Sequence, residues 1–144
     1  MNGQEHIISI EAQLDDKNDI LQINQSIIYH NTSDSTLNHI FLHNWINGYK
    51  NNTSPLARRL IEDYDKSLYF AKQKDRGYSI IKNLTVDYEK VKFFEEEKGK
   101  IDIVKIVLNS PLKPKNQPEL TLPTTLKSPI LNLPATEKQK PAII

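Results

Sequence analysis

The strongest constraint on the fold of this chain is a series of short segments in which apolar residues recur at every second position. The first segment, residues 6–14, alternates between a polar face and a mostly apolar face, as an extended strand does. The mostly apolar face carries His6, Ile8, Ile10, Ala12 and Leu14. A polar turn at residues 15–19 follows, so this segment and the Ile-rich residues 20–30 are expected to pair as a hairpin.

Further strand signals follow along the chain, with turn residues between them. They cover residues 37–45, 78–81, 84–88, 91–94, 101–108 and 119–122. Residues 37–45 are strongly apolar and expected to be buried, while residues 101–108, apolar on both faces, are expected to form a central strand. Pro111 and Pro114 are expected to end regular pairing, which leaves residues 119–122 as a short edge strand. The pattern predicts a mainly β fold, an antiparallel β-sandwich.

One segment changes from strand to helical spacing. Ser54 is suited to cap the N-terminus of a helix, and Pro55 fits the first helical position. Apolar residues then recur at helical spacing, at Leu56, Leu60, Ile61, Tyr64 and Leu68. We expect one helix at residues 55–65, with an extension as far as residue 72, before the break at Gly77.

Composition excludes several classes of function. The chain has 144 residues, enough for one domain, and 19 Lys and Arg against 18 Asp and Glu give a net charge of +1. No basic surplus favours a nucleic-acid partner. The absence of Cys excludes disulfides, Cys-ligated zinc and thiol catalysis. No apolar run approaches the ~18–20 residues of a membrane span, and the first residues show no signal peptide.

Motifs that carry catalysis are missing from the sequence. It contains no nucleophile elbow, no glycine-rich phosphate loop and no dinucleotide fingerprint. His39 and His43 have the spacing of two helical zinc ligands, but their segment is predicted as a strand, which separates them by ~13 Å. We therefore expect no catalytic residue, no metal ligand and no cofactor in this chain.

Aromatic residues offer the remaining candidate for a binding site. Trp45, Tyr49, Phe41 and Tyr29 are interpreted first as core residues, because aromatic residues at strand spacing most often pack inside. The alternative is an exposed aromatic face for a ligand, with Trp45 and Tyr49 as its binding residues.

Residues 37–71 contain the run Leu-Asn-His-Ile-Phe-Leu-His-Asn-Trp-Ile-Asn-Gly-Tyr-Lys-Asn-Asn-Thr-Ser-Pro-Leu-Ala and, later, Tyr-Phe-Ala. This segment resembles the N-terminal domain of gluzincin zinc metallopeptidases. The resemblance is to the aminopeptidase N and leukotriene hydrolase type, in a subgroup common in Bacteroidetes. The chain departs from that pattern at Asn44, Ile46 and Gly48, where Leu, Pro and Ala are expected. Segments at residues 8–16, 27–33, 75–78 and 103–114 resemble the same domain in the same order, so the similarity covers about residues 5–127.

This resemblance implies a saddle-like β-sandwich that packs against a thermolysin-like catalytic domain. It also implies that the zinc ligands and the general base lie in that later domain, so none is assigned to a position here. The chain is thus expected to be a non-catalytic fragment, with the catalytic domain of the intact parent as its missing partner. The parent would be a bacterial zinc aminopeptidase, periplasmic, secreted or membrane-associated, while this chain would bind no zinc.

The last residues suggest a change of reading frame. Back-translation of residues 128–144 from the third base of the Lys127 codon permits a continuation that resembles the family. We therefore expect a domain at residues 1–127 and a frameshifted, disordered tail at residues 128–144, where Pro129, Pro134 and Pro141 oppose regular pairing.

Two other functions remain open from the sequence. The chain would act as a standalone β-sandwich module that binds a carbohydrate or a protein through Trp45 and Tyr49. The other open function is that of a periplasmic or surface scaffold domain that associates with a partner by pairing of sheet edges.

Overall fold

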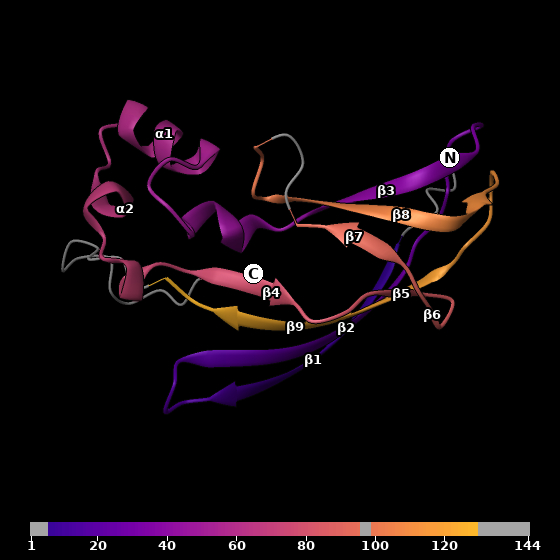
Figure 1. The fold of residues 1–144 in the computed structure, drawn as a ribbon, viewed down its shortest axis with the longest axis horizontal. Helices are drawn as coiled ribbons and strands as arrows, with labels where there is room; N and C mark the ends of the chain where they lie inside the picture. The colour runs from indigo at the N-terminus through magenta and orange to yellow at the C-terminus, as the bar shows by residue number, and fades with distance from the viewer. Residues whose placement is uncertain (1–5, 96–98, 130–144) are drawn as a thin grey trace.

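The computed structural model describes residues 6–95 and 99–129. Two antiparallel sheets pack face to face through one hydrophobic core, and the helical segments lie together at one end (Figure 1). The predicted mainly β, antiparallel architecture is confirmed. The prediction of a disordered tail falls almost wholly outside the described residues.

The larger sheet has the strand order β1-β2-β9-β5-β6, and β4 pairs with β9 beside β5. Its strands are β1 (Ile7–Asp15), β2 (Ile20–Ile28), β4 (Tyr78–Ile81), β5 (Thr85–Val86), β6 (Glu89–Lys90) and β9 (Glu119–Lys127). The expected hairpin is confirmed, because β1 and β2 pair along their whole length, from Ile7 opposite Ile28 to Asp15 opposite Ile20.

The smaller sheet has the order β3-β8-β7, formed by β3 (Leu37–His43), β8 (Ile103–Leu112) and β7 (Lys92–Phe94). β8 lies in its centre, as the sequence predicts from its apolar residues on both faces. β8 continues through Pro111, where pairing was expected to end. The register with β3 shifts between Leu37 and His39, so Pro111 falls in an irregular stretch that needs few ladder donors.

The core is built from alternate residues of the two facing sheets. Buried side chains in it are Ile27, Ile40, Ile81, Leu84, Val104, Ile106, Leu112, Leu120 and Leu122. Leu120 and Leu122 come from β9, which is neither short nor at an edge, because β2 lies on one side of it and β4 and β5 on the other. The prediction of a short edge strand at residues 119–122 is therefore wrong. Pro123 is accommodated because its carbonyl accepts a hydrogen bond from Lys82 N.

The helical region contains four short elements. They are η1 (Trp45–Tyr49), α1 (Pro55–Glu62), α2 (Ser67–Phe70) and η2 (Gln73–Asp75). The Ser54 cap is confirmed, because its hydroxyl accepts a hydrogen bond from Ala57 N. The single helix expected as far as residue 65 or 72 is wrong at its C-terminal end. Tyr64 adopts a φ of 62°, and the hydrogen bonds from Tyr64 N to Ile61 O and from Asp65 N to Leu60 O close the end of α1.

Two strands are more exposed than their composition predicts. β3 buries Ile40 but leaves most of its other side chains exposed, so its predicted burial is wrong. Along β1, the isoleucines and leucine of the apolar face stay more than half exposed. The cause is the unequal width of the two sheets, because the smaller sheet ends at β3 and does not cover the hairpin that extends the larger one.

Candidate functional site

The outer face of β3 carries a row of aromatic rings. Because side chains alternate along a strand, burial of Ile40 and partial burial of Leu42 turn His39, Phe41 and His43 outward. Trp45, the first residue of η1, continues this line. We call His39, Phe41, His43 and Trp45 the aromatic row.

The rings of the aromatic row contact one another in pairs. The Trp45 and His43 rings stack, with centroids 4.7 Å apart and planes 9° from parallel. The His39 and Phe41 rings meet edge to face at 5.1 Å. Lys105 Nζ, from the neighbouring β8, lies 5.9 Å from the centroid of Phe41. The pairs hold the rings in place while leaving ring surface accessible for stacking with a ligand.

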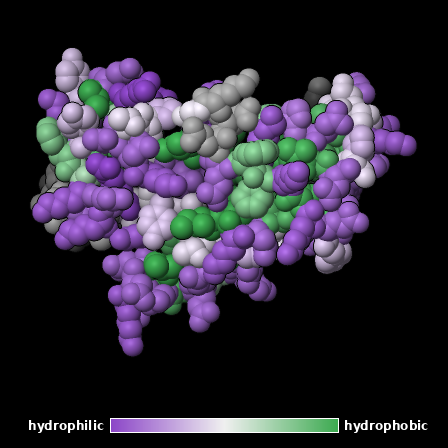
Figure 2. Space-filling model, in the orientation of Figure 1, coloured by the Kyte–Doolittle hydropathy of each residue, from purple (hydrophilic) through white to green (hydrophobic). Residues whose placement is uncertain are grey.

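Further apolar surface adjoins the aromatic row on the same sheet. Phe94 on β7 is paired with Lys105 and is about half exposed. Figure 2 shows hydrophobic side chains gathered, between hydrophilic borders, over the region where β7 and β8 lie in Figure 1. Clusters of this kind are typical of surfaces that bind another molecule.

The two binding residues proposed from the sequence, Trp45 and Tyr49, differ in their exposure. Trp45 is 68% exposed, whereas Tyr49, at the other end of η1, is half-buried. Among the described residues, the ring that stacks on Trp45 is that of His43. The structure therefore retains Trp45 as a candidate contact residue and adds His43, which the sequence analysis had considered only as a metal ligand.

The preferred interpretation of Trp45 and Phe41 as core residues is wrong, because both lie on the surface. Tyr29 does pack against the core. The signal that separates these cases was present in the sequence: Phe41 shares its strand parity with His39 and His43, which are more polar than Ile40 and Leu42.

The four histidines lie in two separate places. His39 and His43 lie on one strand with the Phe41 side chain between them, and the described residues contain no group of three or more His, Cys, Asp or Glu suited to a metal. His6 and His30 are neighbours, as the hairpin suggests, since His6 Nδ1 accepts a hydrogen bond from His30 N at 3.1 Å.

The second candidate surface lies beside β1. Ile8, Ile10 and Leu14 point toward the inner side of the larger sheet, yet they are 54%, 59% and 64% exposed. We call these three side chains the uncovered flank. Next to it, a cavity of about 300 Å³ opens between the sheets, bordered by Ile8 on β1, Ile27 on β2 and, among others, side chains of β3 and β9. The flank and the cavity together form an apolar surface suited to packing against another protein.

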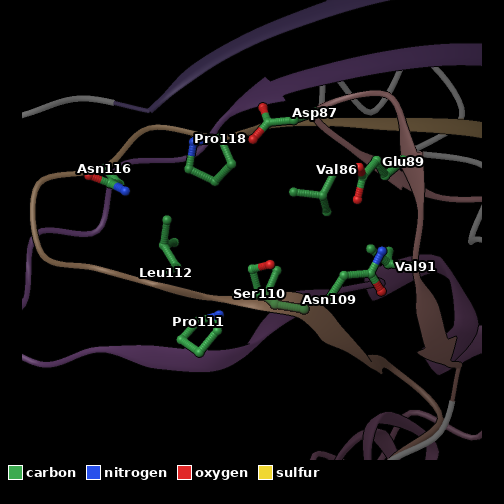
Figure 3. A pocket seen from close by; sticks show the side chains of 11 residues that line it. Val86, Asp87, Glu89, Val91, Asn109, Ser110, Pro111, Leu112, Asn116 and Pro118 are labelled. Carbon is green, nitrogen blue, oxygen red and sulfur yellow. The ribbon is translucent and has the colours of Figure 1, made fainter.

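A second cavity of about 300 Å³ lies between the β5–β6 hairpin and β8 (Figure 3). Two of its polar side chains are engaged within the protein. Asp87 Oδ1 accepts a hydrogen bond from Glu119 N at 2.9 Å, and Asn109 Nδ2 donates to Lys90 O at 3.1 Å. These two bonds support the hairpin and take up part of the polar lining, so this cavity is the weaker candidate.

Comparison with known proteins gives no relative for this chain, because no family model, no curated protein and no solved structure matches it. Among the described residues, no helix has the length and apolar character needed to cross a membrane.

Proposed function

We propose that the chain is a non-catalytic β-domain of a gluzincin-type zinc aminopeptidase, and that its catalytic domain packs on the uncovered flank. The observation that carries this proposal is the exposure of Ile8, Ile10 and Leu14 beside an open cavity between the sheets. Full burial of an exposed side chain of this kind contributes about 1.5–3 kcal/mol. These three are already partly buried, so a domain that covers them gains part of that value from each.

In this proposal the two domains have different roles, one catalytic and one structural. The catalytic domain supplies the zinc ion and the activated water that hydrolyses the peptide bond. The β-domain supplies a rigid apolar surface that holds the catalytic domain in position, and it contributes no catalytic or metal-binding residue. The resemblance at residues 37–71 supports this division.

The test is an assay of the purified chain on aminoacyl-anilides, with added zinc and with EDTA. We expect no turnover under either condition and no stoichiometric zinc. Turnover that EDTA abolishes would contradict the proposal. Nucleotide sequence downstream of codon 127 gives an independent test, because the proposal expects a coding region for H-E-x-x-H in another frame, and its absence there would count against the proposal.

A second function is favoured by the exposure of Trp45, which is 68% exposed and stacked on His43. A flat, fixed aromatic ring on a β-sandwich suits the apolar face of a sugar ring, so the chain is alternatively a carbohydrate-binding module. Titration with neutral oligosaccharides should then change the fluorescence of Trp45, the single Trp of the chain. His43→Ala should weaken the response, whereas Tyr64→Ala, an exposed aromatic residue in another region, should not. Absence of any response to a panel of neutral glycans would exclude this function.

A further inference from the structure

β1 forms the free edge of the larger sheet. It is the first strand in the sheet order and pairs with β2 on one side over nine residues, without a bulge. Its other side is unpaired within the described part of the chain. A strand of this length presents a row of backbone donors and acceptors about 30 Å long, at about 3.4 Å per residue.

This edge lacks the features that prevent strands from pairing with other chains. β1 contains no Lys, Arg or Pro, and its only charged residues are Glu11 and Asp15. By contrast, β7 and β6 at the opposite sides of the two sheets carry Lys92 and Lys90. A regular edge with exposed isoleucines on it favours addition of another strand.

We propose that two copies of this chain pair through β1, antiparallel, about a two-fold axis at Ile10. The proposal does not rest on the proposed function, because it is argued from the unpaired backbone edge of β1, although the pairing also brings Ile8 and Ile10 of the uncovered flank into contact across the axis. It makes the larger sheets of the two copies into one continuous sheet. The pairing is symmetric and closes at two copies, since each β1 has one free edge.

The sequence of β1 selects this register. Opposite residues in an antiparallel pair lie on the same face of the sheet. A two-fold axis between the two strands must therefore set one residue directly opposite the same residue of the other copy. An axis at Glu11 sets the two glutamates directly opposite each other, which is destabilising. An axis at Ser9 shortens the overlap, because Ile7 then lies opposite Glu11 and the ladder ends there. The axis at Ile10 extends the ladder from Ile7 to Gln13 and separates the glutamates.

The contacts made in this register are complementary on both faces. On the inner face, Ile10 meets its symmetry mate and Ile8 meets the small Ala12, which allows close packing. On the outer face, Ser9 of each copy lies opposite Glu11 of the other. Each Ser9 hydroxyl can therefore donate a hydrogen bond to the facing Glu11 carboxylate. The same chemistry occurs on the outer face of this sheet, where Ser26 Oγ donates to Glu119 Oε1 at 2.6 Å.

The first test is the mass of the chain in solution, measured by sedimentation across the micromolar range. We expect a concentration-dependent rise to twice 16.6 kDa. Ile10→Lys should hold the mass at 16.6 kDa, because it sets two ammonium groups against each other. Ile80→Lys is the matched control, an exposed isoleucine on β4, and should leave the dimer intact. A wild-type chain that stays monomeric, or grows beyond two copies, overturns the proposal.

The second test fixes the register by cross-linking, which the absence of native Cys makes direct. Ile10→Cys places two thiols opposite each other at the axis, close enough for a disulfide under mild oxidation. Ala12→Cys is the matched control on the same face. Its two thiols lie about 13 Å apart, four residues along the strand, beyond the reach of a disulfide. Cross-linking of Ala12→Cys but not of Ile10→Cys overturns the proposed axis. Circular dichroism of each variant confirms that it folds.

Discussion

At the scale of single residues, Ser54 joins two parts of the helical region. Its buried hydroxyl accepts a hydrogen bond from Ala57 N at 3.0 Å and donates one to Gly48 O at 2.5 Å. Ser54→Ala removes the cap of α1 and leaves a buried carbonyl without its donor. We expect a loss of about 2 kcal/mol in the free energy of unfolding, measured by urea denaturation.

The neighbouring hydroxyl provides the control for this prediction. Thr53 is exposed, and its hydroxyl donates a hydrogen bond to Asn51 Oδ1 within the same turn. Thr53→Ala should therefore change the free energy of unfolding by less than about 0.5 kcal/mol. Equal losses in the two variants would show that the cap on α1 is not what Ser54 contributes.

Asp15 gives a residue-scale prediction that depends on pH. The Asn18 side chain donates to Oδ2 at 2.8 Å, and this bond, together with the backbone N–H groups of Asn18 and Lys17, lowers the pKa of the carboxyl below 3.8. The lowered pKa means that Asp15 stabilises the β1–β2 turn above pH 3.8 and that this contribution is lost as pH falls through the folded-state pKa. An NMR titration of the Asp15 carboxyl carbon should show a midpoint below 3.8. Asn18→Ala should raise it, and an unchanged midpoint would contradict the assignment.

At the scale of elements, β9 and β1 differ most clearly in burial, because β9 is a central strand and β1 an edge strand of the same sheet. Leu120 on β9 is fully buried, whereas Leu14 on β1 is 64% exposed. Leu120→Ala should lower the free energy of unfolding by about 2–5 kcal/mol, because it leaves a cavity in the core. Leu14→Ala removes the same atoms from the surface and should cost less than about 1 kcal/mol. Comparable costs would mean that the Leu14 side chain is covered in solution.

The local sequence pattern predicted which segments form strands and helices better than it predicted which strands pair with one another. The β1–β2 hairpin follows from alternation at residues 6–14 and the turn at Asp15, and α1 begins where Ser54 and Pro55 indicate. Pairing partners depend on the whole fold, so the central place of β9 was missed. Pro111 and Pro114 suggested that residues 119–122 form an edge strand, but β9 continues through Pro123, whose carbonyl accepts a hydrogen bond from Lys82 N.

The candidate surfaces were also predictable only in part, because exposure depends on the whole fold as well as on local pattern. From the sequence, Trp45 was preferred as a core residue and was a binding residue only in the alternative interpretation. The shared strand parity of Phe41 with His39 and His43 indicated an exposed face, but it was not used. Exposure of β1 depends on the width of the opposite sheet, which ends at β3 and is a property of topology. Alternation indicates that one face of a strand is apolar, and it does not indicate whether another element covers that face.

At the scale of the whole molecule, the described residues carry two apolar surfaces. The smaller sheet leaves the uncovered flank exposed, and the aromatic row lies on the outer face of β3. A hydrophobic dye such as ANS should bind the native chain, because contiguous exposed apolar surface is its usual site. The double variant Ile8→Ser with Leu14→Ser removes apolar atoms from the flank and leaves the aromatic row unchanged. We expect most of the dye fluorescence to be lost, since the flank adjoins an open cavity of about 300 Å³ that accommodates a ring system.

The control places the same loss of apolar surface on the other face. Phe41→Ser with Trp45→Ser changes the aromatic row, and the dye should still bind at the flank. Both pairs lie at exposed positions, so their thermal unfolding midpoints should stay close to that of the wild-type chain. The reverse result, with dye binding lost only in the aromatic-row variant, would make that row the main apolar surface. It would thereby favour the carbohydrate-binding function over docking of a catalytic domain.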